Sequence, residues 1–207
     1  MDQKELKQAY INYVITHGET PNWSYQFIDP INLDSGSFYD HYASLSTLEE
    51  DIWNDLFNES LSRLETEPAY YEYSAQEKLL AFYFTLIEVL SEQRDFIKVL
   101  FKRLRLSLMP SFLKEFKKQY LHHVKNLIRQ AKEEKEALDR PIIDSLYDHG
   151  LWRQCQFIIW FWTRDKSDGY ELTDAAIERA VHLSFDLMGP TPIDSMVGFA
   201  KFLYQSR

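Results

Sequence analysis

Few residues have the types and spacing needed for acid–base or metal chemistry. His122 and His123 are adjacent, so on a helix their rings point about 100° apart and cannot simply bind one metal ion together. Asp144, Asp148 and His149 are near enough in sequence to meet, but capping and surface roles are commoner for such residues. The sequence shows no glycine-rich phosphate loop, nucleophile elbow or zinc-ligand spacing. These patterns predict a protein that is not an enzyme and holds no metal or cofactor.

Hydroxyl and aromatic side chains are concentrated instead in residues 36–48, which read GSFYDHYASLSTL. In TetR-type transcriptional regulators the end of the recognition helix typically has a glycine, a Thr or Ser, an apolar residue and a tyrosine. Two variable positions, an aromatic residue and a small helix-capping residue follow. The residues on this pattern are Gly36, Ser37, Phe38, Tyr39, Tyr42 and Ser44. The segment therefore resembles the helix–turn–helix of that family.

This resemblance implies an all-α, TetR-like fold with a three-helix head at residues 1–45 and a helical ligand-binding and dimerisation domain at 46–207. It also implies a ligand-responsive regulator whose recognition helix enters the major groove of DNA. The DNA-contacting residues would be Ser35, Ser37, Tyr39 and His41, with Tyr39 donating a hydrogen bond to phosphate.

The charge of the head favours a second interpretation. The net charge is −9, and residues 1–50 contain two basic residues, Lys4 and Lys7, against eight acidic ones. Asp29, Asp34 and Asp40 flank the proposed contact face, although DNA affinity depends largely on neutralised phosphates. The alternative is a binding protein for a lipid or another apolar molecule whose TetR-like head no longer binds DNA. Residues 160–188 are also diffusely similar to the lipid-binding ubiquinone-biosynthesis protein that shares the TetR-like fold.

Apolar residues recur at spacings of three and four along most of the chain, which predicts helices. In the head we expect helices over residues 4–16, from 23 or 24, and after a cap at Asp34 or Ser35. Pro30 should shorten or distort the second of these helices, and Asn32 suits the turn that follows. Later helices are expected after a cap at Ser44 or Ser46 to about residue 64, after Ser74 to about 90, at 95–106, from about 110 or 111 to 131, and at 151–162, 173–188 and 193–204.

Two predicted capping boxes pair Ser46 with Glu49 and Ser74 with Glu77. The charged segment 131–139 is expected to project into solvent. Residues 91–140 contain thirteen basic and seven acidic residues. A basic helix face of this kind is usually just solvated, but it could also dock an anionic membrane or an acidic partner.

Aromatic residues of the C-terminal part suit either simple core packing or a ligand cavity between helices. The family resemblance implies an apolar small-molecule effector here, with Tyr120 or His123 orienting a polar end. The predicted pocket residues are Phe84, Phe116, Tyr120, His123, Phe157 and Phe161.

The helices at 151–162 and 173–188 match the positions at which TetR-like proteins form a four-helix interface between two subunits. This implies a homodimer with Trp160, Trp162, Ala176 and Ala180 in the interface. Cys155, the one cysteine, lies in an apolar run and is expected to be buried. With no export signal and no apolar run of about 18 residues, the expected location is the cytoplasm, without a membrane span.

Overall fold

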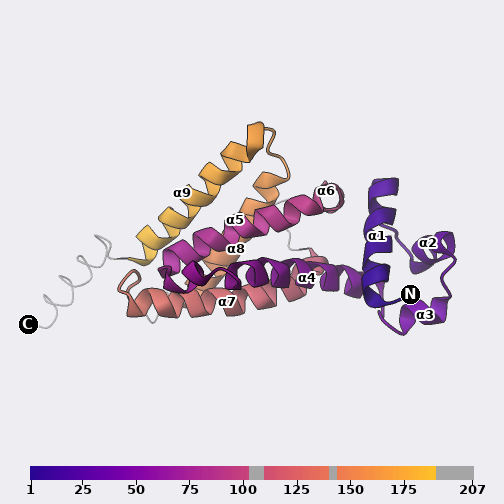
Figure 1. Cartoon of the computed structure of the whole chain (residues 1–207), viewed down its shortest axis with the longest axis horizontal. Coiled ribbons are helices and arrows are strands. Elements are labelled where there is room, and N and C mark those ends of the chain that lie inside the picture. The colour runs from indigo at the N-terminus through magenta and orange to yellow at the C-terminus, as the bar shows by residue number, and fades with distance from the viewer. Residues whose placement is uncertain (103–109, 140–143, 190–207) are drawn as a thin grey trace, which may run out of the picture.

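The structure, a computed structural model, describes residues 1–102, 110–139 and 144–189. These residues form an all-α fold in which a small N-terminal head is joined to a longer helical bundle (Figure 1). The predicted fold class is confirmed. The helix expected at 193–204 lies outside the described residues.

Three helices build the head. Helix α1 (Gln3–His17) is capped by Asp2 and ends at Gly18, whose φ of 66° is in the left-handed region. Helix α2 (Ser24–Ile28) continues into a 3₁₀ turn (Asp29–Ile31) that contains Pro30, because proline cannot donate the next helical hydrogen bond. Asn32 then adopts φ 50° and ψ 37°, as its tolerance of left-handed dihedrals predicts.

Helix α3 (Ser35–Tyr39) begins at Asp34, whose carboxylate accepts a hydrogen bond from the Ser37 amide. A Cβ at position 36 would lie 2.8 Å from the Asp34 Oδ2 atom, so a larger residue there would displace this capping carboxylate. The predicted cap at Asp34 and the short, interrupted second helix are therefore both present in the head.

Helix α4 (Leu45–Glu65) starts in the head and continues through the bundle (Figure 1). Its cap is Ser44, which is paired with Thr47, so the predicted Ser46–Glu49 capping box is wrong. The Glu49 carboxylate instead accepts a hydrogen bond from the Tyr10 hydroxyl of α1. Glu49 therefore helps to join the head to α4.

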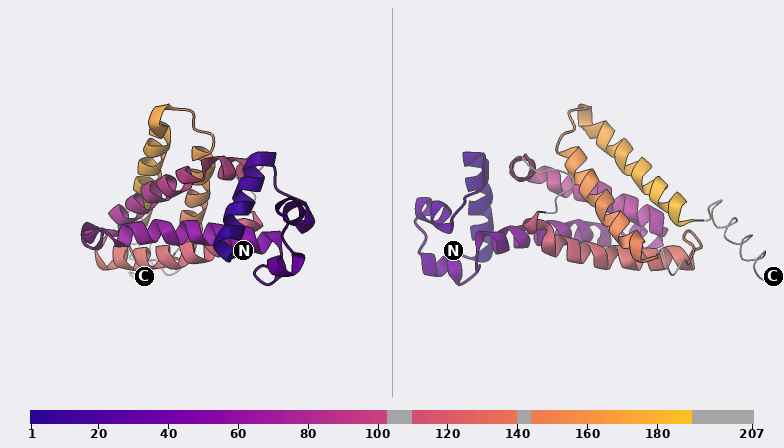
Figure 2. Two further views of the ribbon diagram at one scale, coloured as in Figure 1. Left: turned by 45° about the vertical axis from the view of Figure 1, so that its right-hand side comes forward. Right: turned by 180° about the vertical axis from the view of Figure 1, so that it is seen from behind.

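The bundle consists of α4 with five further helices: α5 (Ala75–Glu92), α6 (Arg94–Phe101), α7 (Lys114–Glu133), α8 (Asp144–Trp162) and α9 (Glu171–Met188). Three 3₁₀ turns, Pro68–Glu72, Ser111–Leu113 and Asp168–Tyr170, lie between them. Helices α4, α5 and α7 pack together, α8 packs on α7, and α9 packs on α5 and α8, while α6 contacts α1 of the head. Figure 2 shows α8 and α9 as a hairpin along one side of the bundle.

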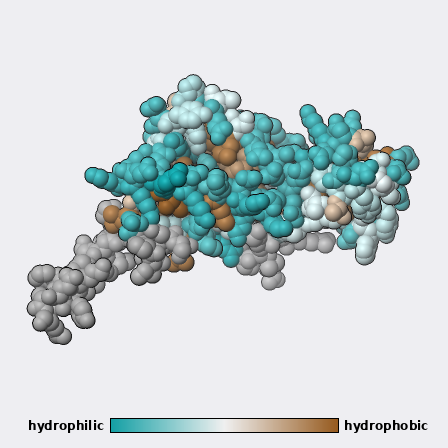
Figure 3. All heavy atoms as spheres, turned by 90° about the horizontal axis from the view of Figure 1, so that it is seen from below, coloured by the Kyte–Doolittle hydropathy of each residue, from teal (hydrophilic) through white to brown (hydrophobic). Residues whose placement is uncertain are grey.

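The packed face of α7 follows the predicted periodicity, and its residues Phe116, Tyr120, Val124, Leu127 and Ala131 are all buried. In the view of Figure 3, hydrophilic residues cover most of the surface, and hydrophobic residues show only as separate patches. Among the described residues, no helix combines the length and the apolar character needed to cross a membrane.

The segment after α7 does not project into solvent as predicted. Glu134 accepts a hydrogen bond from the Ala75 amide at 3.2 Å, and Glu136 accepts one from the Gln76 amide at 3.3 Å. These carboxylates satisfy the first amides of α5, which have no acceptor within their own helix. Ala137 is buried nearby. The segment is thus held against the start of α5.

Candidate nucleic-acid interface and effector region

Helix α3 and the turn after it contain the four predicted DNA-contacting residues, with His41 in that turn. Ser35, Tyr39 and His41 are exposed, with Tyr39 53% accessible, and Ser37 is half-buried. The Tyr39 hydroxyl lies 2.7 Å from Ser24 Oγ, which links α3 to the start of α2. The structure therefore brings these side chains onto one helix–turn–helix with its outer face open.

Apolar contacts beneath this face hold α3 in place. Phe38 is fully buried, and its ring lies 6.3 Å from that of Phe27 in α2. Phe27 in turn packs edge-on against Tyr10 of α1 at 5.4 Å. Edge-to-face aromatic pairs add roughly 0.5–1.5 kcal/mol each beyond the burial of their surface. The three head helices consequently form one packed unit.

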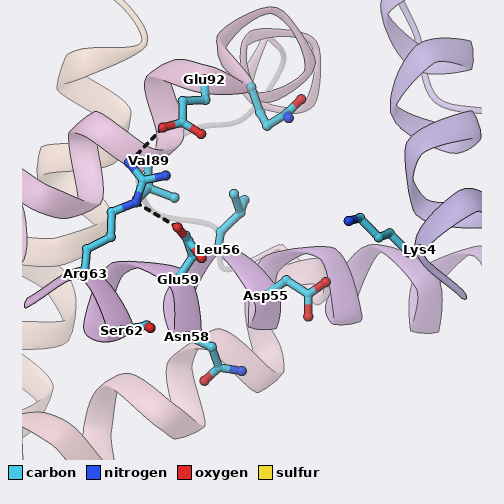
Figure 4. Close-up of a pocket in the computed structure, with 10 residues that line it drawn as sticks. Lys4, Asp55, Leu56, Asn58, Glu59, Ser62, Arg63, Val89 and Glu92 are labelled. Atoms are coloured by element: carbon cyan, nitrogen blue, oxygen red, sulfur yellow. Dashed lines mark hydrogen bonds and ion pairs between the residues drawn. The ribbon is translucent and has the colours of Figure 1, made fainter. Parts of the chain in front are cut away.

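Of the two lysines in residues 1–50, Lys7 does not add an unpaired charge to the head. The Lys7 ammonium lies 2.8 Å from Asp51 Oδ2 and also contacts Asp55, so its charge is neutralised by α4. Lys4 lines a groove of about 570 Å³ together with Asp55 and Glu59 (Figure 4). Across the same groove, Arg63 lies 2.7 Å from Glu92.

Three carboxylates remain near the exposed face of the head. Asp34 has a structural role as the α3 cap, whereas Asp29 and Asp40 are exposed and make no ion pair among the described residues. Phosphates approaching α3 would meet hydroxyl groups as hydrogen-bond donors but also a negative field. The side chains near α3 are therefore better suited to donating hydrogen bonds to phosphates than to neutralising their charge.

The head also exposes two aromatic rings that are not among the residues predicted from the sequence. Trp23 and Tyr25 are both more than half exposed and lie at the start of α2. The sequence predicts burial of Trp23 together with Phe27 and Ile28 in the second helix, but Trp23 precedes α2 as its N-terminal cap residue and is 63% exposed. These rings enlarge the apolar portion of the head surface.

The six predicted pocket residues do not surround one shared space. Phe116 and Tyr120 are fully buried and stack on each other, with ring centroids 6.5 Å apart. Phe84 is 37% exposed. Phe157 and Phe161 contact each other and are half-buried. They follow the fully buried Cys155 by about 200° and 240° of helical rotation, so neither lies on the most buried face of α8, although Phe157 still packs against the edge of the core.

Tyr120 takes part in a buried polar network instead of facing a cavity. Its hydroxyl lies 2.5 Å from that of Tyr83 on α5 and donates a hydrogen bond to the Leu151 carbonyl of α8 at 2.9 Å. The Tyr83 hydroxyl also reaches Gln154, whose amide nitrogen donates to Ser184 of α9 at 2.8 Å. Burial raises the pKa of both tyrosines, so both hydroxyls stay protonated.

His123 of the predicted pocket has a ring nitrogen that forms no hydrogen bond with the described residues. Its ring lies 5.1 Å from that of Phe82 and 6.4 Å from that of Phe57. The Nε2 atom is buried and has no hydrogen-bond partner among the described residues. Burial, together with the neighbouring His122, lowers the pKa of His123 to about 4. The ring is therefore neutral near pH 7.

The outer surface of α9 carries a second apolar stripe beside its buried one. Leu172 and Leu183 are 58% and 59% exposed, and Ala176 and Ala180 lie between them at spacings of four, four and three. Trp160 is half-buried on α8, with the Arg164 guanidinium 4.4 Å from its ring. The predicted interface set does not include Leu172 and Leu183. Their spacing from the two alanines in the sequence would have placed them on the same helix face.

Trp162 differs from the other three predicted interface residues because it is fully buried within its own chain. It lies on the same side of α8 as Cys155 and Ile158, which are also completely buried. In this conformation it cannot contact a second subunit. Helical position explains the difference. Trp162 is two positions after Trp160, which places the two side chains about 200° apart around the axis of α8.

Comparison with protein families identifies the second part of the chain. Residues 78–203 match the family described as tetracyclin repressor-like, C-terminal domain, which covers more than half of the chain. No curated protein matches the sequence. The matched region includes α6 to α9 and nearly all of α5, but not the head.

Proposed function

Because this chain belongs to the tetracyclin repressor-like family, we propose that it is a homodimeric transcriptional regulator that binds DNA through α2 and α3. The observation that carries the proposal is the packed helix–turn–helix, whose Ser35, Tyr39 and His41 side chains are exposed. A helix placed in this way can enter the major groove while hydroxyl groups contact phosphates.

The head has few cationic side chains, and this determines how strongly its DNA affinity should depend on salt. Each neutralised phosphate adds close to one unit to the slope of log affinity against log salt. With Lys7 paired to Asp51, we expect a slope well below that of a protein with 6–10 phosphate contacts. Binding would therefore be weak and would depend mainly on hydrogen bonds to bases and phosphates.

A salt-titrated binding assay on genomic DNA fragments tests the proposal. Tyr39→Phe should weaken binding to all sequences similarly, since phosphate contacts carry no sequence information. Asp40→Asn should tighten binding by removing a repulsive charge, whereas Asp168→Asn, far from the head in the turn before α9, should not change it. The absence of measurable affinity at about 50 mM salt, where phosphate contacts are strong, would reject the regulator proposal. The binding protein for apolar molecules would then be the better assignment.

We place the proposed apolar effector beside His123, because its buried Nε2 atom lacks a hydrogen-bond partner among the described residues. Tyr120 is less suitable, since its hydroxyl is already bonded to the Leu151 carbonyl. An effector with a polar end would enter between the rings of Phe57 and Phe82 and pair with the imidazole. Denaturing mass spectrometry of the purified protein would detect a retained ligand, and His123→Phe should abolish retention.

A further inference from the structure

Three large aromatic side chains are exposed where α2 begins and α3 ends. Trp23, Tyr25 and Tyr39 are 63%, 57% and 53% accessible. Trp23 and Tyr25 flank Ser24, whose hydroxyl oxygen lies 2.7 Å from that of Tyr39. This hydrogen bond brings the start of α2 and the end of α3 together, so the three rings lie at one corner of the head. We call Trp23, Tyr25 and Tyr39 the aromatic face.

The part of the chain that forms the aromatic face carries only negative charge. Residues 18–44 contain four acidic residues and no lysine or arginine. Asp29 lies one helical turn after Tyr25, and Asp40 directly follows Tyr39. Both carboxylates are exposed and form no ion pair among the described residues. Unpaired carboxylates therefore lie next to two of the three rings.

The two lysines of the head do not neutralise these carboxylates, because both are directed towards α4. The Lys7 ammonium lies 2.8 Å from Asp51 of α4. Lys4 lines the groove that α4 and α5 border (Figure 4). Figures 1 and 2 show α2 and α3 on the other side of α1, away from the bundle. The aromatic face thus keeps its negative surroundings.

Contact with DNA does not explain this combination of side chains. DNA affinity depends on cations that neutralise phosphates, whereas Asp29 and Asp40 repel them. Grouped aromatic residues on a surface are instead typical of protein-binding sites, in which tryptophan and tyrosine supply much of the binding energy. The negative charge indicates that the partner is cationic.

We propose that the aromatic face binds an arginine-rich segment of another protein. A guanidinium group stacks its plane on an aromatic ring while its N–H groups donate charge-assisted hydrogen bonds to a carboxylate. Asp29 and Asp40 provide such carboxylates beside the rings of Tyr25 and Tyr39. Because Tyr39 is also a proposed phosphate contact, the bound segment would compete with DNA, and this consequence alone rests on the proposed function.

Isothermal titration calorimetry with a synthetic peptide of four Arg-Gly repeats, at constant ionic strength, tests the proposal. Wild-type protein should bind saturably, and Trp23→Ala/Tyr25→Ala should bind about tenfold more weakly, since two cation–π contacts are lost. The matched control Tyr71→Ala/Tyr73→Ala removes two exposed rings before α5 and should bind as the wild type does. If the head variant does not fold, Tyr25→Ala alone serves, because this side chain is exposed.

A second pair of variants separates local from overall charge. Asp29→Asn/Asp40→Asn should weaken peptide binding about three- to tenfold, since each exposed ion pair contributes little. Asp168→Asn/Glu171→Gln changes the net charge by the same amount in the turn before α9 and should leave binding unchanged.

The proposal is overturned if the peptide does not bind, or if the head variants and their controls weaken binding equally. Equal effects would indicate attraction to the net charge of −9 as a whole. It is also overturned if Trp23→Ala/Tyr25→Ala weakens binding to DNA but not to the peptide, because the rings would then contact nucleic acid. The peptide assay contains no DNA, so its failure leaves the regulator proposal intact.

Discussion

At the scale of single residues, two buried titratable groups illustrate opposite effects of the protein interior. The Asp165 carboxylate accepts hydrogen bonds from the amide and hydroxyl groups of both Ser167 and Thr173, at 2.6–2.9 Å. Burial opposes its charge, but these four bonds outweigh that effect and lower the pKa of Asp165 to about 2. His123 has no such compensation, and burial lowers its pKa to about 4.

Replacing Asp165 with Asn should destabilise the protein by about 1–3 kcal/mol, because an amide accepts fewer and weaker hydrogen bonds than a carboxylate. In the wild type this contribution should be complete above pH 3.8 and should be lost as the pH falls towards 2. Urea denaturation monitored by circular dichroism measures the unfolding free energy of both proteins at each pH. The exposed Asp168→Asn variant is the control, and equal effects of the two substitutions would contradict the assigned role.

His123 should make the protein less stable in mild acid. The unfolded chain takes up this proton near pH 6.5, whereas the folded protein takes it up only near pH 4. Lowering the pH through this window therefore favours unfolding, by on the order of 2 kcal/mol at pH 4.5. His123→Phe should show a smaller loss of unfolding free energy between pH 7 and 4.5 than the wild type. His41→Gln, at an exposed position of the head, should retain the wild-type loss.

At the scale of elements, one hydrogen-bond network connects four helices. Tyr83, Tyr120, Gln154 and Ser184 lie on α5, α7, α8 and α9, respectively. Gln154 additionally donates to the Ala180 carbonyl at 2.5 Å. This network ties the outer α8–α9 hairpin to the centre of the bundle, where hydrophobic contacts alone would allow alternative registers.

Removing one tyrosine hydroxyl should cost about 1–3 kcal/mol, because the remaining buried partner loses its hydrogen bond. Removing both should cost less than the sum, since the two hydroxyls bond to each other. Chemical denaturation of Tyr83→Phe, Tyr120→Phe and the double variant measures the three losses of unfolding free energy that this double-mutant cycle compares. Strictly additive costs would show that the two hydroxyls contribute independently.

At the scale of the whole molecule, the apolar stripe on the outer side of α9 is the surface on which the homodimer proposal depends. Leu172, Ala176, Ala180 and Leu183 form it, and the half-buried Trp160 lies on the adjacent α8. Small residues at its centre permit close helix approach, and a two-fold axis would bring the same stripe from each subunit together. The head lies at one end of the elongated chain, beyond this hairpin (Figure 1).

Multi-angle light scattering at micromolar concentration should give the mass of two chains. Leu183→Lys should shift the mass towards a single chain, because a lysine would be buried without a counter-charge. Glu178→Gln changes the net charge by the same amount on the opposite side of α9 and should leave the dimer intact. A wild-type mass of one chain would contradict the homodimer proposal.

Local sequence patterns were sufficient for the fold class and for most helices. Spacings of three and four identified the buried face of α7, Pro30 shortened α2, and the Ser74–Glu77 capping box begins α5. These features depend on interactions between residues a few positions apart. For that reason they are readable without the tertiary structure.

Tertiary structure decided which partner each side chain meets. Glu49 was assigned to a local cap but accepts the Tyr10 hydroxyl, and Tyr120 was assigned to a cavity but bonds to Tyr83 and the Leu151 carbonyl. Trp160 and Trp162 are equally apolar, yet only Trp162 is fully buried. Periodicity defines a helix face, but the helices that cover it come from distant parts of the chain. Side-chain partners across that distance depend on how the bundle packs.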